Sequence, residues 1–379
     1  MRRLAYRPPF SSARVLTSPF PLLALLATLN MQGAAASEDP RTTAAPLLTE
    51  PQRAVMLAVG RAGRRLIAVG ERGIVLISDD NGAHWRQSKV PVSVTLCVVR
   101  FADDRNGWAA GHSGVVLHST DAGETWTRQL DGDVVVQLML RDAETRVATA
   151  PDDAAAAKAL AEAKQLVADG PDKPFLDLFF TDAATGFVTG AYGMILHTGD
   201  AGHSWQPWTA YVDNRNGAHL YALKSGAKRL YLAGEQGYFA VSEDGQHFEA
   251  RKVPYDGTFF GALALGDSGV ILFGLRGTIM RSSDAGRSWL KIATGEEGAL
   301  QGGVRLKDGT IILVSDRGRL LASRDEGEHF VPLKVAALGP LSGIAEAEDG
   351  AIVVAGIQGL TRLATGSSGL NASPQRRQD

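Results

Sequence analysis

Aspartates recur along this chain within one short pattern, Ser-x-Asp-x-Gly-x-x-Trp, which we call the Asp-box turn. Repeated carboxylates could act as general acids and bases or bind metal ions. Each copy holds one aspartate, however, and successive copies lie about forty or more residues apart, too far to share an ion. We therefore interpret each aspartate as accepting backbone N–H groups within a hairpin, with the glycine at positive φ and the tryptophan packed beside the neighbouring repeat. These structural residues are Asp80, Trp85, Asp121, Trp126, Asp200, Trp205, Asp244, Asp284, Trp289 and Asp325.

No other group of reactive residues indicates catalysis. The eight histidines lack metal-ligand spacing, so we expect no metal and no cofactor. The sequence contains no phosphate-binding loop, nucleophile elbow or Cys–His pair. Cys97 is the single cysteine; it lies in the apolar run 94–99, and we expect an inert buried thiol. We assign no catalytic residue.

The Asp-box turn is half of a longer repeat that defines the fold. Each copy begins at a Gly-x-x-Gly turn or a variant of it, and the first residues of these turns fall at positions 70, 111, 190, 234, 274, 315 and 356. A period near forty with several short, β-branched strands per unit is typical of a β-propeller. One four-stranded sheet buries little apolar surface alone, so we predict that seven pack face to face around an axis. The fold class is therefore all-β, a seven-bladed β-propeller over residues 41–366.

Residues 131–173 make one repeat about twice as long as the others, between blades 2 and 3. Residues 152–170 are rich in alanine, begin with capping aspartates and end at Gly-Pro, so we predict an inserted loop that contains one helix. An eighth, degenerate blade would need an Asp-box turn, which this segment lacks.

Blade 7 raises a separate question, because the last repeat lacks an outer strand. Residues 46–49 precede the first repeat and are free to fill that place. We therefore predict that they form a strand of blade 7 and close the ring.

The two ends of the chain differ in composition from the repeats. Residues 1–36 carry four arginines, a short apolar run at 20–29 and small residues at 34–36, which is typical of a secretory signal peptide. No cysteine follows directly, and no later run approaches the ~20 apolar residues of a spanning helix, so we expect a soluble periplasmic monomer, at most peripheral to the membrane. The net charge of −2 provides no basic field for nucleic acid. Residues 367–379 are expected to be a disordered tail.

The candidate binding surface is the rim that carries the Gly-x-x-Gly turns. If the Asp-box turns join strands three and four at one face, these turns, which join strands two and three, lie at the opposite face with the crossovers and the helical insertion. Binding residues are common on such loops, and three of the turns read x-Arg-Gly. We predict that this rim binds a partner through Arg72, Arg276, Arg317, Tyr192, Glu71, His112 and Glu235.

Residues 85–112 and 175–193 resemble the Ycf48/Hcf136-like family of BNR-repeat propellers, in its proteobacterial branch, and the similarity extends over residues 51–363. The resemblance implies a non-enzymatic seven-bladed scaffold. In this family, the resemblance implies, photosynthetic members hold a newly made membrane subunit during photosystem II assembly. An arginine-rich patch is implicated in this binding. Proteobacterial relatives are implied to work with envelope exporters of the RND/MMPL type.

We therefore expect a periplasmic binding or assembly scaffold for a membrane-protein complex or transporter, accessory to an RND/MMPL-type exporter. Two alternatives stay open. Asp-box turns are widespread in sialidases, so the chain could be a sialidase-like, carbohydrate-active enzyme; that would need inward-facing arginines and a Tyr–Glu nucleophile pair. The other alternative is a photosystem II assembly factor.

Overall fold

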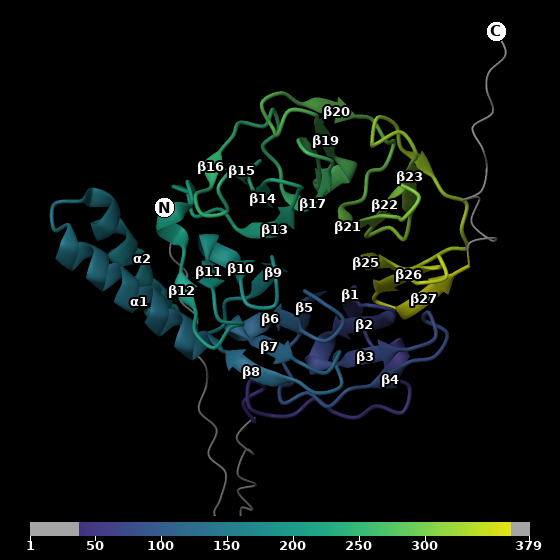
Figure 1. The fold of residues 1–379 in the computed structure, drawn as a ribbon, viewed down its shortest axis with the longest axis horizontal. Coiled ribbons are helices and arrows are strands. Elements are labelled where there is room, and N and C mark those ends of the chain that lie inside the picture. Colours follow the sequence, from purple (N-terminus) through teal and green to yellow (C-terminus); the bar gives the residue numbers. More distant parts are fainter. Residues whose placement is uncertain (1–37, 365–379) are drawn as a thin grey trace, which may run out of the picture. The chain divides into compact units, whose positions relative to one another are not determined.

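A computed structural model describes residues 38–364, and the signal peptide and tail predicted from the sequence lie outside this part of the chain. Seven antiparallel sheets form a ring in which each sheet packs on the next (Figure 1). Six sheets have four strands each, and the seventh has three. The predicted seven-bladed β-propeller is therefore confirmed.

The strands of each blade follow one another in sequence and in space, from the centre of the ring outward. Blades 1 to 4 comprise β1 (Met56–Ala62), β2 (Arg65–Gly70), β3 (Val75–Ser78) and β4 (Arg86–Gln87); β5 (Leu96–Phe101), β6 (Gly107–Gly111), β7 (Val116–Ser119) and β8 (Thr127–Leu130); β9 (Phe175–Phe180), β10 (Gly186–Gly190), β11 (Ile195–Thr198) and β12 (Gln206–Pro207); and β13 (Leu220–Ser225), β14 (Leu230–Gly234), β15 (Phe239–Ser242) and β16 (Glu249–Ala250). Blades 5 to 7 comprise β17 (Phe259–Leu265), β18 (Gly269–Gly274), β19 (Ile279–Ser282) and β20 (Leu290–Ile292); β21 (Leu300–Arg305), β22 (Ile311–Ser315), β23 (Leu320–Ser323) and β24 (Val331–Pro332); and β25 (Leu341–Glu346), β26 (Ile352–Gly356) and β27 (Gly359–Leu363).

The core lies between neighbouring blades. The second strand of a blade is apolar on both faces, because an adjacent blade covers each of them; all five residues of β6, for example, are buried. The Asp-box tryptophan closes the same interface from the next blade, as Trp126 of blade 2 does where it packs in one cluster with Ile67 of blade 1. Fully burying a Leu or Ile side chain contributes about 1.5–3 kcal/mol, so these interfaces supply most of the cohesion between sheets.

The insertion between blades 2 and 3 is a helical hairpin that lies beside blade 3, outside the ring (Figure 1). It consists of α1 (Gly132–Thr149) and α2 (Ala154–Asp169). The predicted insertion with a helix is confirmed by α2, but α1 was not predicted. Its first turn contains three consecutive valines, which disfavour a helix locally. The Asp131 side chain caps that turn by accepting the N–H of Val134, and Val135 packs with the blade 3 core, so tertiary packing overrides the propensity.

The prediction that residues 46–49 complete blade 7 is wrong. These residues form no strand; they run beside the outer edge of blade 1. The side-chain amide of Gln87 in β4 donates to Pro46 O at 2.7 Å and accepts from Leu48 N at 3.1 Å, while Ala45 N donates to Val90 O at 3.0 Å. Gln87 thus satisfies the peptide groups that would otherwise be available to blade 7.

A hydrogen bond that recurs between blades adds to the apolar contacts that hold the ring, and we call it the latch. In each latch a side chain of one blade donates a hydrogen bond to a backbone carbonyl in the Asp-box turn of the next blade. The accepting carbonyl belongs to a residue with positive φ in every pair except that of Trp208 with Gln246. The donor–acceptor pairs are Arg362 with Asn81, Arg65 with Ala122, Gln129 with Ala201, Trp208 with Gln246, Arg251 with Ala285 and Arg281 with Glu326.

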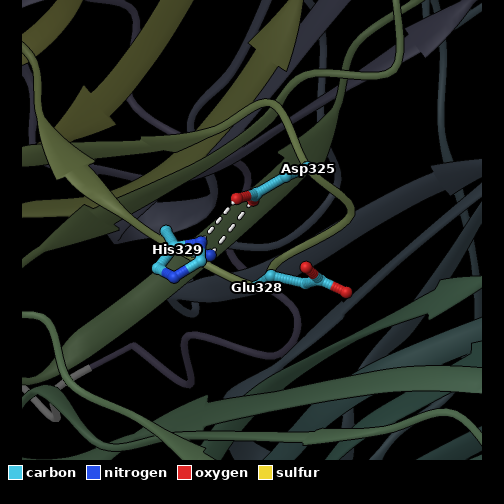
Figure 2. A group of neighbouring side chains, drawn as sticks. All are labelled: Asp325, Glu328 and His329. Carbon is cyan, nitrogen blue, oxygen red and sulfur yellow. Dashed lines mark hydrogen bonds and ion pairs between the residues drawn. The ribbon is translucent and has the colours of Figure 1, made fainter. Parts of the chain in front are cut away.

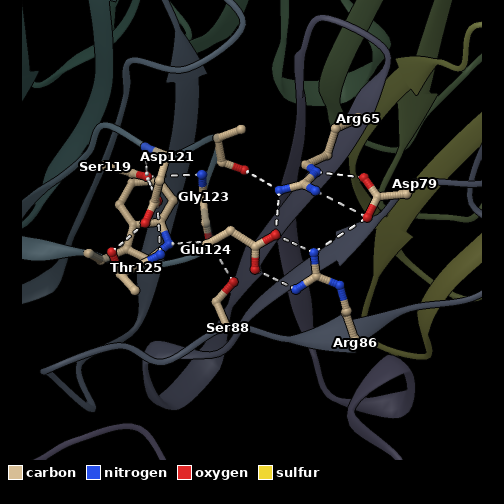
Figure 3. Close-up of polar contacts among 11 residues, drawn as sticks. Arg65, Asp79, Arg86, Ser88, Ser119, Asp121, Gly123, Glu124 and Thr125 are labelled. Carbon is tan, nitrogen blue, oxygen red and sulfur yellow. Dashed lines mark hydrogen bonds and ion pairs between the residues drawn. The ribbon is translucent and has the colours of Figure 1, made fainter.

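The latch between blades 1 and 2 is reinforced by ion pairs (Figure 3). Arg65 of β2 pairs with Asp79 of its own blade at 2.6 Å and with Glu124 of blade 2 at 2.8 Å. Arg86 of β4 also donates to Glu124, at 2.6 Å. The hydrogen bond from Arg86, followed by that from Arg65, lowers the pKa of Glu124, so this carboxylate stays charged between the two blades.

We expect Arg362→Leu to weaken ring closure, because Arg362 joins the last blade to Asn81 O in the first at 3.0 Å. A charge-assisted hydrogen bond at a partly exposed site contributes about 1–2 kcal/mol. The free energy of unfolding, measured in urea, should fall by about that amount. The control is Arg53→Leu, which removes an exposed pair with Glu50 and should cost about 0.5 kcal/mol or less. Equal losses in the two variants would contradict the latch.

Candidate functional site

The Gly-x-x-Gly turns hold their second variable residue in a strained and exposed position. This residue is Arg72 in blade 1, Tyr192 in blade 3 and Arg276 in blade 5, and their φ angles are 53°, 56° and 56°, respectively. Side-chain-bearing residues visit this left-handed region rarely, and such strain persists only where the surroundings impose it. The next glycine imposes it in blade 1: a Cβ on Gly73 would lie 2.1 Å from Val92 O of the crossover. The turn is thereby clamped, and its side chain points into solvent.

The helical hairpin lies at the same rim as these turns, as the sequence predicted. Gly114, which ends the turn of blade 2, donates its N–H to Lys173 O at 2.9 Å just after the hairpin. A Cβ at this glycine would lie 2.8 Å from the Cα of Gly132, the first residue of α1. The hairpin therefore covers the rim near blades 2 and 3 and leaves the turns of blades 5, 6, 7 and 1 uncovered by it.

The three predicted arginines all lie on that uncovered part, which we call the arginine arc. Arg276, Arg317 and Arg72 belong to blades 5, 6 and 1, and each side chain is exposed. Among residues 38–364, Arg72 and Arg276 have no ion-pair partner, whereas Arg317 pairs with the exposed Glu297 at 3.0 Å. Two exposed apolar side chains, Leu275 and Ile357, occupy turns of the same arc. The arc thus combines guanidinium groups with apolar contact area.

Two acidic residues predicted to contact a partner are bonded to the scaffold. Glu71 accepts the N–H of Val55 at 3.1 Å, and Glu235 accepts the N–H of His219 at 3.1 Å. Each donor stands just before the innermost strand of its blade, so the carboxylate ties the turn to that strand. Asp316 does the same in blade 6 by accepting the N–H of Ala299 at 2.9 Å. Glu71 and Asp316 thereby anchor the turns that display Arg72 and Arg317, and Glu235 anchors the turn of blade 4.

The other two predicted residues lie on the part of the rim beside the hairpin. Tyr192 is 59% exposed, its ring centroid lies 4.9 Å from that of His219, and Lys173 Nζ lies 5.7 Å above the ring. His112, in the turn of blade 2, is exposed. The structure therefore separates these residues from the arginine arc, and the predicted set is spread over two surfaces.

Tyr192 also lines a cleft that sequence reasoning missed. A cavity of about 320 Å³ lies between the helical hairpin and blade 3, with Met139, Arg146, Leu166 and Met194 among its lining residues. Its existence depends on α1, for which the sequence carries no strong helical signal. The cleft widens the rim surface that a partner could contact.

The Asp-box turns have the role predicted for them. The Asp121 carboxylate accepts the backbone N–H of Thr125 at 3.0 Å, and the other aspartates accept equivalent bonds within their own hairpins. Because each carboxylate is bonded inside its turn, it is not directed at a shared site.

One Asp-box turn brings together three groups of the kind that bind cations: Asp325, Glu328 and His329 (Figure 2). All three are exposed, and His329 Nδ1 lies 2.7 Å from an Asp325 oxygen. The same aspartate–histidine contact recurs at Asp80 with His84 and at Asp244 with His247; in the other turns, a Ser or Thr hydroxyl takes the place of the histidine. The group is therefore explained by hairpin hydrogen bonding.

The innermost strands line a central cavity of about 130 Å³. Each of these strands carries a β-bulge at its second residue, which leaves that residue out of the strand pairing. Bulges re-aim side chains, and here all seven bulged residues line the cavity. We call them the collar: Leu57, Cys97, Leu176, Tyr221, Phe260, Gln301 and Ser342. Cys97 is thus half-buried against the cavity rather than deep in a sheet, and burial raises its pKa to about 11.

Comparisons with known proteins agree with this fold. Residues 61–139 and 156–334, more than half of the chain, match the family described as photosynthesis system II assembly factor YCF48. The chain belongs to this family. The unmatched stretch between the two segments falls within the helical hairpin.

One curated relative is the photosystem II assembly lipoprotein Ycf48 of Synechococcus sp. (strain CC9902). It is 29% identical over 182 residues, which cover 47% of this chain and 43% of the relative. The match therefore spans less than half of that protein's length.

Solved structures of similar fold include YCF48 bound to D1 peptide, with a TM-score of 0.58, 16% identity and coverage of 85% of this chain and 96% of that chain. YCF48 from Cyanidioschyzon merolae gives 0.59 and 14%, with coverage of 86% and 99%. The WD40 β-propeller domain of Doa1 gives 0.60 and 12%, with coverage of 85% and 95%. At these identities the likeness shows the fold alone.

Within residues 38–364, no helix is both long and apolar enough to cross a bilayer.

We expect the Asp-box turns to make stability depend on acid pH. Hydrogen bonds from the Ser204 and Ser288 hydroxyls lower the pKa values of Asp200 and Asp284 to about 2, below the ordinary value of about 3.9. A carboxylate whose pKa is lower in the folded state contributes stability above about pH 4, which is lost as the pH falls towards 2. The melting temperature should therefore decline over that range.

The matched comparison for this prediction uses two substitutions. Asp284→Asn should lower the melting temperature at pH 7 and reduce the decline below pH 4. Asp267→Asn, at an exposed aspartate outside the Asp-box turns, should change neither. A melting temperature that stays flat from pH 5 to pH 2 in the unaltered protein would contradict the argument.

Proposed function

We propose that this protein is a non-enzymatic scaffold that binds a subunit of a membrane-protein complex through its rim. Membership in the Ycf48 family supports an assembly role, and a structure of YCF48 with a bound D1 peptide shows that one member of this fold takes a peptide. The observation that carries the proposal is the arginine arc: Arg72 and Arg276 stand exposed on clamped turns without an ion-pair partner among the described residues.

The chemistry of the arc supports an acidic, amphipathic segment as the bound partner. Guanidinium groups recognise carboxylates through paired hydrogen bonds, and the exposed Leu275 and Ile357 offer apolar contact beside them. Rigid turns lose little conformational entropy when they bind, which favours affinity. We therefore expect the partner to present carboxylates and apolar side chains together.

We place this interaction at the periplasmic face of a membrane, with the protein peripheral to it. The signal-like composition of residues 1–36 supports export, and the lipoprotein nature of the Synechococcus relative supports work at a membrane. An exporter of the RND/MMPL type is the complex that we propose for this chain. Photosystem II assembly, the role printed in the relative's name, is the second candidate.

The central cavity supports binding rather than glycoside hydrolysis. Among the described residues that line it are one arginine, Arg100, one tyrosine, Tyr221, and one carboxylate, Asp177. Glycosidases of the usual kind need two carboxyl groups about 5–10 Å apart, and a sialidase-like site needs several inward arginines with a Tyr–Glu pair. A single acid that is already bonded to its neighbours fits neither requirement.

We expect the triple substitution Arg72→Glu, Arg276→Glu, Arg317→Glu to abolish partner capture by repelling an acidic segment. The measurement is a crosslinking pull-down from native envelopes with the full chain, quantified by mass spectrometry. The melting temperature should stay unchanged, because the three side chains are exposed. The matched control reverses three exposed arginines of the opposite face: Arg105, Arg287 and Arg324.

The outcomes separate the candidate functions. Capture of an exporter subunit that is lost only in the rim variant supports the proposal, and capture of a photosystem subunit supports the second candidate. If the rim variant captures the same partner as the unaltered chain, the rim assignment is wrong. Turnover of fluorogenic glycosides without a stable partner would identify an enzyme instead.

A further inference from the structure

The central cavity holds three charged side chains from adjacent blades, and neither the latches nor the rim accounts for them. Asp177 of blade 3 is 3% exposed; its Oδ2 accepts the N–H of Leu223 at 2.9 Å and pairs with Lys224 Nζ of blade 4. Arg100 of blade 2 places Nη2 3.7 Å from Asp177 Oδ1. The three residues line one cavity together.

The charges in this cavity do not balance. Two cations face one carboxylate, and Asp177 is the single acid among the described residues that line the cavity. Cys97 does not supply a second negative charge, because burial keeps it a neutral thiol. Burial lowers the pKa of Lys224, and Asp177, in direct contact with it, is its counter-charge. Arg100 is then left without a carboxylate of its own in the cavity, and a bound monoanion would supply its counter-charge.

Arg100 is placed to receive that anion. Its side chain is 41% exposed, and its distance of 3.7 Å from Asp177 exceeds a hydrogen bond, whereas Lys224 is in direct contact with the carboxylate. The guanidinium group therefore retains donors for a ligand. A planar carboxylate matches its forked N–H groups better than a spherical ion does.

The collar and the cavity volume limit what the ligand can contain besides its charged group. Leu57, Cys97, Leu176, Tyr221 and Phe260, one on each of blades 1 to 5, line the cavity together with the charged groups. The cavity of about 130 Å³ is close to the engineered apolar cavity of about 150 Å³ that holds benzene. Its size therefore fits one small ring or a short alkyl chain beside the charged groups.

We propose that the central cavity binds a small monocarboxylate, with its carboxylate on Arg100 and Lys224 and its apolar part against the collar. The site is distinct from the rim and does not depend on the partner-binding function. It gives the propeller a small-molecule ligand, which is a second binding activity.

The test is isothermal titration of the full chain with benzoate and with butyrate, against benzamide and sodium chloride. Benzoate should bind about tenfold or more tightly than benzamide, because the neutral amide cannot neutralise the excess positive charge in the cavity. Equal binding of benzoate and benzamide, or no binding of either carboxylate, would overturn the proposal. Binding of chloride without binding of benzoate would overturn the carboxylate assignment and leave an inorganic anion site.

Variants locate the binding. Arg100→Gln leaves the Asp177–Lys224 pair in place but removes the excess charge, and it should weaken benzoate binding roughly ten- to a hundredfold. The matched control is Arg305→Gln: Arg305 also lies on an innermost strand and is 41% exposed, but it is not among the residues that line the cavity. The rim triple variant should bind benzoate normally. Unchanged affinity in Arg100→Gln would place the ligand elsewhere and contradict the proposal.

Discussion

A hydrogen bond from one blade's side chain to a carbonyl in the next blade's Asp-box turn recurs around the ring, and it joins sheets whose cohesion comes mostly from buried apolar side chains. The aspartate satisfies the N–H groups of its own turn, and in most of these turns the positive φ of one residue presents its carbonyl to the neighbouring blade. One local motif therefore serves both as a hairpin and as an interface. The same contact closes the ring between Arg362 and Asn81, where no covalent connection joins the blades.

Locking the blades at the Asp-box face leaves the opposite rim free to differ from blade to blade. Each Gly-x-x-Gly turn there needs only its glycines and, in three blades, an acid that accepts a backbone N–H from just before the innermost strand of the same blade. The second variable residue is exposed, so it can change without disturbing the core. The helical hairpin occupies this face for the same reason: it extends a crossover and interrupts no latch.

The rim and the cavity present their positive charges in different ways. On the arginine arc the guanidinium groups are solvated and separated by whole blades, which suits an extended macromolecular surface. In the cavity Arg100 and Lys224 share one carboxylate in a confined space, which suits a small ion. The surroundings of the charges, rather than their sign, distinguish the two kinds of site.

The sequence by itself determined the propeller, the seven blades, the hairpin role of the aspartates and the presence of a helix in the insertion. These features depend on residues a few positions apart, such as Asp121 and Thr125, or on a repeat that can be counted. Only the tertiary structure decided the rest. The helix α1 forms because a blade buries Val135; Gln87 diverts residues 46–49; and Arg100, Asp177 and Lys224 meet because three blades are neighbours. Contacts between residues so distant in sequence depend on which strands face one another. A local sequence pattern does not specify this arrangement.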